Sequence, residues 1–265
     1  MELPIYQVDA FATSVFAGNP AAICPLDNWL PESTMQAIAA ENNLSETAFF
    51  VRDGDVFQLR WFTPVCEIDL CGHATLASAY VLFRELNEPG ESLHFETKSG
   101  RLIVTRDGDR LALDLPSRPP APVQAHPALT RALGGKPVEI LAARDYLVRY
   151  QAEQEVRSLQ PNMEALKGID RFAVIVTAPG ENCDFVSRFF APAKGIPEDP
   201  VTGSAHCTLI PYWAAQLGKT ELHARQISPR GGELFCKLKG NRVEIAGRAA
   251  LFLRGTIQAG NGTGI

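Results

Sequence analysis

The sequence is poor in basic residues and has no long apolar run. Its 25 Lys and Arg residues are outnumbered by 30 Asp and Glu residues, which gives a net charge of −5. Nucleic-acid-binding proteins usually present a clustered basic face, so a small-molecule partner is expected instead. No run approaches the roughly 18 to 20 apolar residues that span a bilayer, and residues 1–11 lack the basic start of a secretion signal. We therefore expect a cytoplasmic protein without a membrane partner.

Cysteine is also sparse. The chain has six cysteines, scattered along 265 residues without a secretion signal, so we expect free thiols in a reducing compartment. With 46% hydrophobic and 21% charged residues, the composition is that of an ordinary globular protein and excludes a disordered or fibrous chain. The length suits one large domain or two of typical size.

Short β-like runs bounded by turn residues dominate the first part of the chain, which favours a mostly antiparallel sheet. The expected strands are residues 5–11, 21–26, 47–51, 56–62, 93–97, 102–105 and 110–115. Two helices interrupt them. One begins at Pro31, a residue suited to a first helical turn. The other, residues 73–83, follows Gly72 and is apolar nearly all round, which predicts a central helix buried on every side.

A proline-rich segment, residues 115–126, cannot continue a helix or a central strand and is the best linker candidate. It predicts two domains, residues 1–116 and 117–265, with the last strand as a segment that could return to the first domain. Beyond the linker the same order recurs, with strands at residues 138–142, 146–149, 172–177 and 184–190, a helix after Gly203, and strands from residue 222 to 258.

An internal repeat supports this division. Residues 57–64 read FQLRWFTP and residues 185–192 read FVSRFFAP, identical at four of eight positions. Both runs lead through a short loop to a glycine that opens an apolar helix, Gly72 in the first half and Gly203 in the second. We interpret the two halves as an ancient duplication, with chance similarity of two strand-loop-helix units as the alternative.

Two helices that open at a glycine each offer free N–H groups and a positive dipole end, and together they could hold one anion in a cleft between the domains. A small carboxylate substrate suits such a cleft. The expected binding residues are small or carry a hydroxyl group: Gly72, Ala74, Thr75, Thr202, Gly203, Ser204 and Ala205. Ordinary helix capping is the alternative explanation for the hydroxyl groups.

Three ionisable residues near these turns are candidates for chemistry. Glu46 precedes an apolar strand, and a partly desolvated carboxylate there would have a raised pKa suited to proton transfer. His73 lies in the first turn of the buried helix, where the dipole favours neutral imidazole. Asp199 lies just before the second helix. From the residues alone, each also has a structural reading: a turn residue, a buried structural histidine and a helix cap.

Four segments, taken together and in order, resemble the signature stretches of the PhzF-like family of phenazine biosynthesis. They are DAFATSVFAGNPAAI, NNLSETAFF, FTPVCEIDLCGHATLASAY and GIPEDPVTGSAH. The resemblance covers essentially the whole chain. It implies an α+β protein with two similar domains of the diaminopimelate epimerase type, each a mostly antiparallel sheet wrapped around a central helix.

The resemblance also implies site residues and a reaction. Glu46 corresponds to the catalytic acid/base, with His73 and Asp199 as its active-site partners. Further residues around the substrate are Asn19, Ser45, Gly72, Gly203 and Ser204. We expect a cofactor-independent isomerase, with no metal, that moves a proton between carbons of a small carboxylate substrate.

Three other readings stay open. Related epimerases of this fold use one cysteine before each glycine, but here Thr202 replaces the second, so an epimerase would have to pair Cys71 with Glu46. A metal-dependent hydrolase would draw on Cys66, Cys71, His73, His206 and Cys207, which lack a standard ligand spacing. A binding protein without turnover could keep the same motifs. Exposed sheet edges also make a homodimer one expected assembly.

Overall fold

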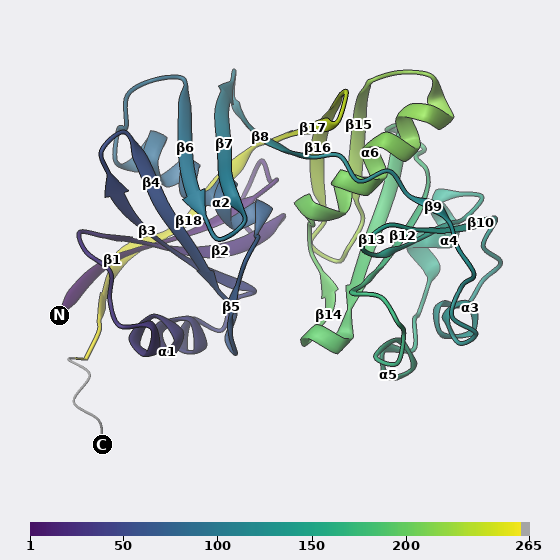
Figure 1. Cartoon of the computed structure of the whole chain (residues 1–265), viewed down its shortest axis with the longest axis horizontal. Coiled ribbons are helices and arrows are strands. Elements are labelled where there is room, and N and C mark those ends of the chain that lie inside the picture. Colours follow the sequence, from purple (N-terminus) through teal and green to yellow (C-terminus); the bar gives the residue numbers. More distant parts are fainter. Residues whose placement is uncertain (261–265) are drawn as a thin grey trace. The chain divides into compact units, whose positions relative to one another are not determined.

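The computed structural model describes residues 1–260, and the chain divides into two compact units (Figure 1). The first unit contains Met1–Asp114 and the stretch from Ala246 onward, and the second contains Leu115–Ile245. The first boundary falls within strand β8, Arg110–Pro116, and the second within strand β17, Arg242–Gly247. The last strand therefore groups with the first unit.

The first unit consists mainly of strands, with two helical segments. Its other strands are β1 (Glu2–Ala10), β2 (Asn19–Leu26), β3 (Glu46–Asp53), β4 (Val56–Phe62), β5 (Glu67–Ile68), β6 (Ser92–Thr97), β7 (Gly100–Asp107) and β18 (Ala249–Gln258). Its helices are α1 (Glu32–Asn42) and α2 (Gly72–Tyr80), and α2 continues into a π-helical turn, Val81–Glu85.

Strands of the first unit pair in the order β18-β1-β2-β3-β4-β6-β7-β8, mostly antiparallel, with parallel pairs at β2–β3 and β4–β6. Helix α2 contacts β1, β2, β3, β7 and β18, so the sheet curves around it (Figure 1). Residues 72–79 of α2 are all buried. A helix apolar on every side is stable only inside protein, which is the position that its sequence predicts.

The second unit repeats this plan with more helices. Its other strands are β9 (Ala121–Pro122), β10 (Glu139–Ala142), β11 (Tyr146–Arg149), β12 (Val174–Pro179), β13 (Phe185–Ala191), β14 (Ile196–Asp199), β15 (Glu221–Gln226) and β16 (Gly232–Lys239). Its helices are α3 (Leu129–Leu133), α4 (Glu153–Ser158), α5 (Met163–Leu166), a 3-10 turn at Pro192–Lys194, and α6 (Gly203–Leu217).

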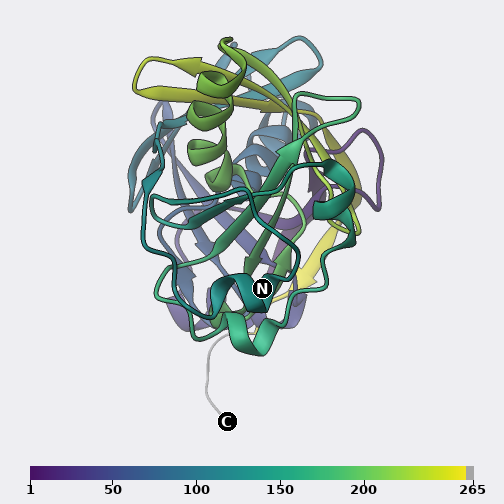
Figure 2. The ribbon, with the colours of Figure 1, turned by 90° about the vertical axis from the view of Figure 1, so that its right-hand side faces the viewer.

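The pairing pattern of the second unit matches that of the first. Antiparallel β10–β11, parallel β11–β12, antiparallel β12–β13, parallel β13–β15 and antiparallel β15–β16 follow the sequence of pairings from β1 to β7. Strand β13 takes the place of β4, and α6 that of α2. Helix α6, drawn in light green, contacts β15 and β16 (Figure 2). The segments FQLRWFTP and FVSRFFAP thus occupy equivalent strands.

Each unit has its own apolar core. In the first, Met35, Phe49 and Phe62 belong to a cluster between α1 and the sheet. In the second, a cluster that includes Tyr150 and Phe190 joins the short helices α3, α4 and α5 to the sheet. Burial of such clusters is the main favourable term in folding.

The structure confirms the α+β class and the buried central helix. Helix α1 begins one residue later than predicted, because Pro31 is its N-cap residue. The sequence analysis did not predict α3, α4 or α5, and it extended the first predicted strand to Phe11, which has a positive φ of 60° after β1 ends. Within residues 1–260, every helix is too short or too polar to span a bilayer. All six cysteine side chains are free thiols.

Candidate functional site

The parallel pairing of β2 with β3 brings Asn19 and Glu46 to the same sheet edge. Asn19 is the first residue of β2, Glu46 is the first of β3, and the register pairs Ala21 with Glu46. Gly18 makes the turn before β2 with φ of 65°, and a Cβ there would lie 2.1 Å from the Ala10 carbonyl oxygen. Only glycine fits this turn, so the GNP sequence fixes where Asn19 lies.

The start of α2 places His73 between three polar groups. Its Nε2 lies 3.1 Å from Glu46 Oε2, while on the other side of the ring Nδ1 lies 3.2 Å from Asn19 Nδ2 and 3.5 Å from Cys71 Sγ. All four residues are buried, with exposed fractions of 6% or less. The structure therefore brings the predicted residues Asn19, Glu46 and His73 together, with Cys71 beside them.

Two atoms of this group are buried and unsatisfied. Although Glu46 Oε2 and His73 Nε2 are close, neither has a hydrogen bond of acceptable geometry within residues 1–260. Buried polar atoms almost always have partners, and the exceptions are frequent at catalytic sites and at sites that hold a ligand. Contact of these two atoms with a bound molecule stays a prediction.

The local charges set the protonation of this group. Burial disfavours a charged imidazole, but the neighbouring Cys71 and Glu46 groups together raise the pKa of His73 well above its ordinary value. Burial, followed by the Glu46 carboxylate, raises the pKa of the Cys71 thiol to about 11. At neutral pH Cys71 is therefore a protonated thiol, and the Glu46 carboxylate is a neighbour that favours a charged His73 imidazole.

The second unit holds a different polar network at the start of α6. The Thr202 hydroxyl donates to Asp199 Oδ2, and the Thr202 N–H donates to Gln226 Oε1 over 2.8 Å. Gln226 Nε2 in turn donates to the Asp199 carbonyl oxygen over 2.8 Å. These bonds fix the loop that connects β14 to α6.

Gln226 is a member of this network that the sequence analysis missed. It ends β15, where Leu222, Ala224 and Gln226 alternate with exposed or half-buried residues and point inward. A glutamine at a core-facing position of an alternating strand was the available signal, since buried amides are retained where they satisfy other groups.

Other predicted residues lie at these helix starts but have partners of their own. The Thr75 hydroxyl donates to the Cys71 carbonyl oxygen over 2.5 Å, and the Thr202 hydroxyl is bonded to Asp199. Ser45 and Ser204 are half-buried. The small residues Gly72, Ala74, Gly203 and Ala205 are buried in the first turns of α2 and α6. Substrate contact at these positions stays a prediction, as do the roles of Asn19 and Asp199.

Sequence and structure comparisons now place this geometry in a family. The family model described as phenazine biosynthesis-like protein matches residues 8–255. An uncharacterized isomerase of Pseudomonas aeruginosa is 54% identical, over 97% of this chain and 99% of the relative. The crystal structure of a PhzF-family protein of Enterococcus faecalis is 51% identical, with a TM-score of 0.95, over 97% of this chain and 100% of that chain. The chain belongs to the PhzF family.

A structure of much lower sequence identity shares the fold. The PhzF chain resembles a hydroxyproline epimerase of Agrobacterium vitis with 11% identity and a TM-score of 0.61, over 97% of this chain and 92% of that chain. At this identity the likeness concerns the fold alone, the diaminopimelate epimerase type. The close relatives support an enzyme of isomerase or epimerase type, which confirms the predicted enzyme class.

Two of the five residues of the hydrolase alternative, Cys71 and His73, lie close together beside Glu46 in the described part of the chain. Among residues 1–260, the group of donor side chains close enough to share an ion is Glu46, Cys71 and His73. Cys66, in the same unit, is exposed and lies outside this group.

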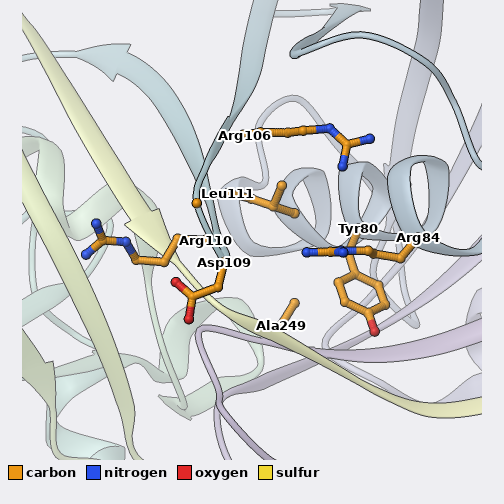
Figure 3. Close-up of a pocket in the computed structure, with 8 residues that line it drawn as sticks. Tyr80, Arg84, Arg106, Asp109, Arg110, Leu111 and Ala249 are labelled. Atoms are coloured by element: carbon orange, nitrogen blue, oxygen red, sulfur yellow. The ribbon is translucent and has the colours of Figure 1, made fainter.

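A separate cavity of about 320 Å³ lies in the first unit (Figure 3). Arg84 and Arg106 extend toward it with Tyr80, opposite Asp109 and Arg110. Its lining, within the described residues, includes none of the predicted site residues. Tyr80 follows His73 by seven residues, which is about 10 Å along α2. The cavity is thus at the opposite end of the central helix from Glu46.

Proposed function

We propose that this protein is a cofactor-independent isomerase in which Glu46 moves a proton between two carbons of a small carboxylate substrate. The observation that carries the proposal is the contact between Glu46 Oε2 and His73 Nε2, two buried atoms 3.1 Å apart that have no aligned hydrogen bond within residues 1–260. A carboxylate beside a histidine, with no aligned hydrogen bond on either of the facing atoms within residues 1–260, suits a substrate that both donates and receives a proton.

The reaction needs one group to act twice. Glu46 as carboxylate removes a proton from a carbon next to an electron-withdrawing group, and the electron pair of that C–H bond delocalises into the conjugated substrate. Glu46, now a carboxylic acid, returns the proton to a second carbon, and the pair forms the new C–H bond. Atoms and electrons balance within the substrate, so no oxidant or reductant takes part.

Positive charge near Glu46 supports an anionic substrate and its anionic intermediate. The pKa of His73 is raised by its neighbours, so the site favours the imidazolium form. The start of α2 adds the positive end of the helix dipole, and among the described residues its N-cap, Cys71, makes no side-chain capping bond. A carboxylate substrate would receive both contributions, and the intermediate would be stabilised as charge develops.

The chemistry of Cys71 favours this mechanism over the epimerase alternative. A cysteine base must be a thiolate, and the pKa of the Cys71 thiol is raised to about 11. The matching position in the second unit is Thr202, whose hydroxyl already donates to Asp199. A mechanism with Glu46 alone does not require the Cys71 thiol to lose its proton, whereas the epimerase alternative does.

Solvent isotope exchange tests the proposal. Proton NMR in deuterated water would follow a panel of cyclic and acyclic amino and hydroxy acids with the wild type, Glu46→Gln and the control Glu41→Gln, which alters an exposed carboxylate in the same unit. We expect exchange or a double-bond shift in the wild type and the control, and none in Glu46→Gln. Ligand binding without exchange by any variant would favour the binding-protein alternative. The cytoplasmic location and the homodimer stay predictions.

A further inference from the structure

Three donor atoms of different chemistry meet at the start of α2. These atoms lie within 4.8 Å of one another: a carboxylate oxygen of Glu46, the sulfur of Cys71 and a ring nitrogen of His73. The three side chains come from two elements: Glu46 begins β3, and Cys71 and His73 flank the glycine that opens α2. The fold therefore assembles the group.

We infer that Glu46, Cys71 and His73 form a binding site for Zn²⁺ that inhibits the enzyme. Zinc binds oxygen, nitrogen and sulfur ligands, and three protein ligands with one open position are a known arrangement of zinc sites. An independent observation supports a ligand here. Glu46 Oε2 and His73 Nε2 are buried and have no hydrogen-bond partner within the described residues.

The donor set selects a class of cation. Mg²⁺ and Ca²⁺ take oxygen ligands, usually six or more, and this group offers one carboxylate with a sulfur and a nitrogen. A thiolate and an imidazole favour a borderline-soft ion instead, and Zn²⁺ is the one that needs no redox change. The three side chains should therefore bind Mg²⁺ and Ca²⁺ only weakly.

The distances require only a small adjustment. In a tetrahedral zinc site with bonds of about 2.0 to 2.3 Å, neighbouring donor atoms lie about 3.3 to 3.8 Å apart. His73 Nε2 and Glu46 Oε2 are 3.1 Å apart, and Cys71 Sγ is 3.5 Å from the other ring nitrogen, Nδ1. One ring nitrogen would act as the ligand. One donor atom of each residue lies within 4.8 Å of the other two, so bringing the donors to a spacing of about 3.8 Å requires a shift of about 1 Å at most.

Zinc at this position would occupy the atoms that the proposed mechanism uses. The ion would bind the Glu46 oxygen that otherwise accepts the substrate proton, and it would replace the proton on the His73 ring nitrogen. Substrate and metal would therefore compete for the same atoms. This consequence rests on the proposed function, whereas zinc binding itself does not. The metal is thus a reversible inhibitor of the site and not a cofactor.

Metal binding can be measured without a known substrate. Titration of the full chain with Zn²⁺, against a chromophoric chelator, would be compared for the wild type, Cys71→Ser, Glu46→Gln and His73→Asn. Two controls alter groups outside the cluster: Cys66→Ser removes an exposed thiol, and His223→Gln removes a histidine paired with Glu233 in the second unit. Co²⁺ in place of Zn²⁺ reports a bound thiolate through charge-transfer absorption in the near ultraviolet.

We expect one Zn²⁺ per wild-type chain, unchanged in both controls and weakened by more than about 100-fold in Cys71→Ser, since even loss of an outer-shell partner can reach that size. The cobalt band should appear in the wild type and be absent in Cys71→Ser. Zinc binding that survives in all three cluster variants, or its absence from the wild type, would overturn the inference. Exchange that depends on Glu46 but resists Zn²⁺ would overturn the inhibition alone. Zinc binding without any isotope exchange would leave the site standing and contradict the proposed function.

Discussion

The two units share one scaffold but differ in what lies beside the equivalent helix starts. In the first unit, α2 begins next to a carboxylate, and His73 lies 3.1 Å from Glu46. In the second unit, α6 begins next to a closed network of Asp199, Thr202 and Gln226. Within residues 1–260, Glu46 Oε2 and His73 Nε2 at the first start and His206 Nε2 at the second are buried without a hydrogen bond, but at the first start a carboxylate lies beside the histidine. The proposed mechanism therefore draws its acid/base group from one copy of the repeat.

The histidines of the two helices show how strongly neighbouring groups change the pKa of a buried imidazole. Both are completely or almost completely buried, His73 with 4% exposed and His206 with none. The pKa of His73 is raised in the company of Cys71 and Glu46, whereas burial lowers the pKa of His206 to about 4. His206 Nδ1 lies 2.8 Å from the Thr202 carbonyl oxygen, a neutral acceptor. Burial alone suppresses the charge, and an adjacent anion restores it.

The largest expected effect concerns His206 in the second unit. Its low pKa should make the free energy of unfolding depend on pH. The folded pKa of His206, about 4, lies below the ordinary value near 6.5, so only the unfolded chain takes up this proton as the pH falls from 6.5 toward 4. The free energy of unfolding should then fall by about 3 kcal/mol over that window. Denaturant melts at several pH values would measure it.

The matched variants separate this proton from the others. His206→Gln should lose most of that acid dependence, whereas His223→Gln, which alters a partly exposed histidine of the same unit, should keep it. An equal acid loss in the wild type and in His206→Gln would show that other groups cause it.

Replacement of His73 in the first unit should lower the isotope-exchange rate and have less effect on the free energy of unfolding. His73→Gln keeps a polar side chain beside Glu46 but cannot carry charge, so we expect the exchange rate to fall by about 100-fold. His94→Gln, a half-buried position in the same unit, is the control and should retain the wild-type rate. A full rate in His73→Gln would remove His73 from the mechanism.

A smaller effect tests whether the second network is structural. Gln226→Ala leaves the Thr202 N–H and the Asp199 carbonyl oxygen without their bonds, and an unsatisfied buried group costs about 1 to 3 kcal/mol. We expect a decrease of about 2 kcal/mol in the free energy of unfolding, measured by denaturant titration.

Two further variants make this result interpretable. Gln226→Glu keeps the acceptor for Thr202 but places a buried carboxylate oxygen against the Asp199 carbonyl oxygen, so it should be at least as destabilised as Gln226→Ala at neutral pH. Gln216→Ala, an exposed position on α6, should change little. A stable Gln226→Ala variant would mean that the loop does not depend on this side chain.

Much of this arrangement could be predicted from the sequence. Short β-like runs bounded by turn residues marked most strands, and the apolar stretch after Gly72 marked the buried helix, because both patterns are local in the sequence. The match between residues 57–64 and 185–192 predicted the repeated plan that β4 and β13 now display. The resemblance, not the pattern, singled out Glu46 from the other carboxylates.

The remaining features depend on long-range geometry. Helices α3, α4 and α5 contain only four to six residues, too few to show a helical period. The Gln226 network joins residues 24 to 27 positions apart in the chain. The contact of Glu46 with His73 follows from the register of β2 with β3, and a one-residue slip would turn Glu46 to the other face. None of these relations is local in the sequence.

The most direct test compares Glu46→Gln with Cys71→Ala in the same isotope-exchange measurement, on the first compound that the wild type exchanges. If one carboxylate performs both proton transfers, Glu46→Gln should lower the rate by about 1,000-fold, and Cys71→Ala should stay within about 10-fold of the wild type. A collapse of the rate in Cys71→Ala, with substantial exchange left in Glu46→Gln, would contradict the account and assign the proton transfer to the thiol.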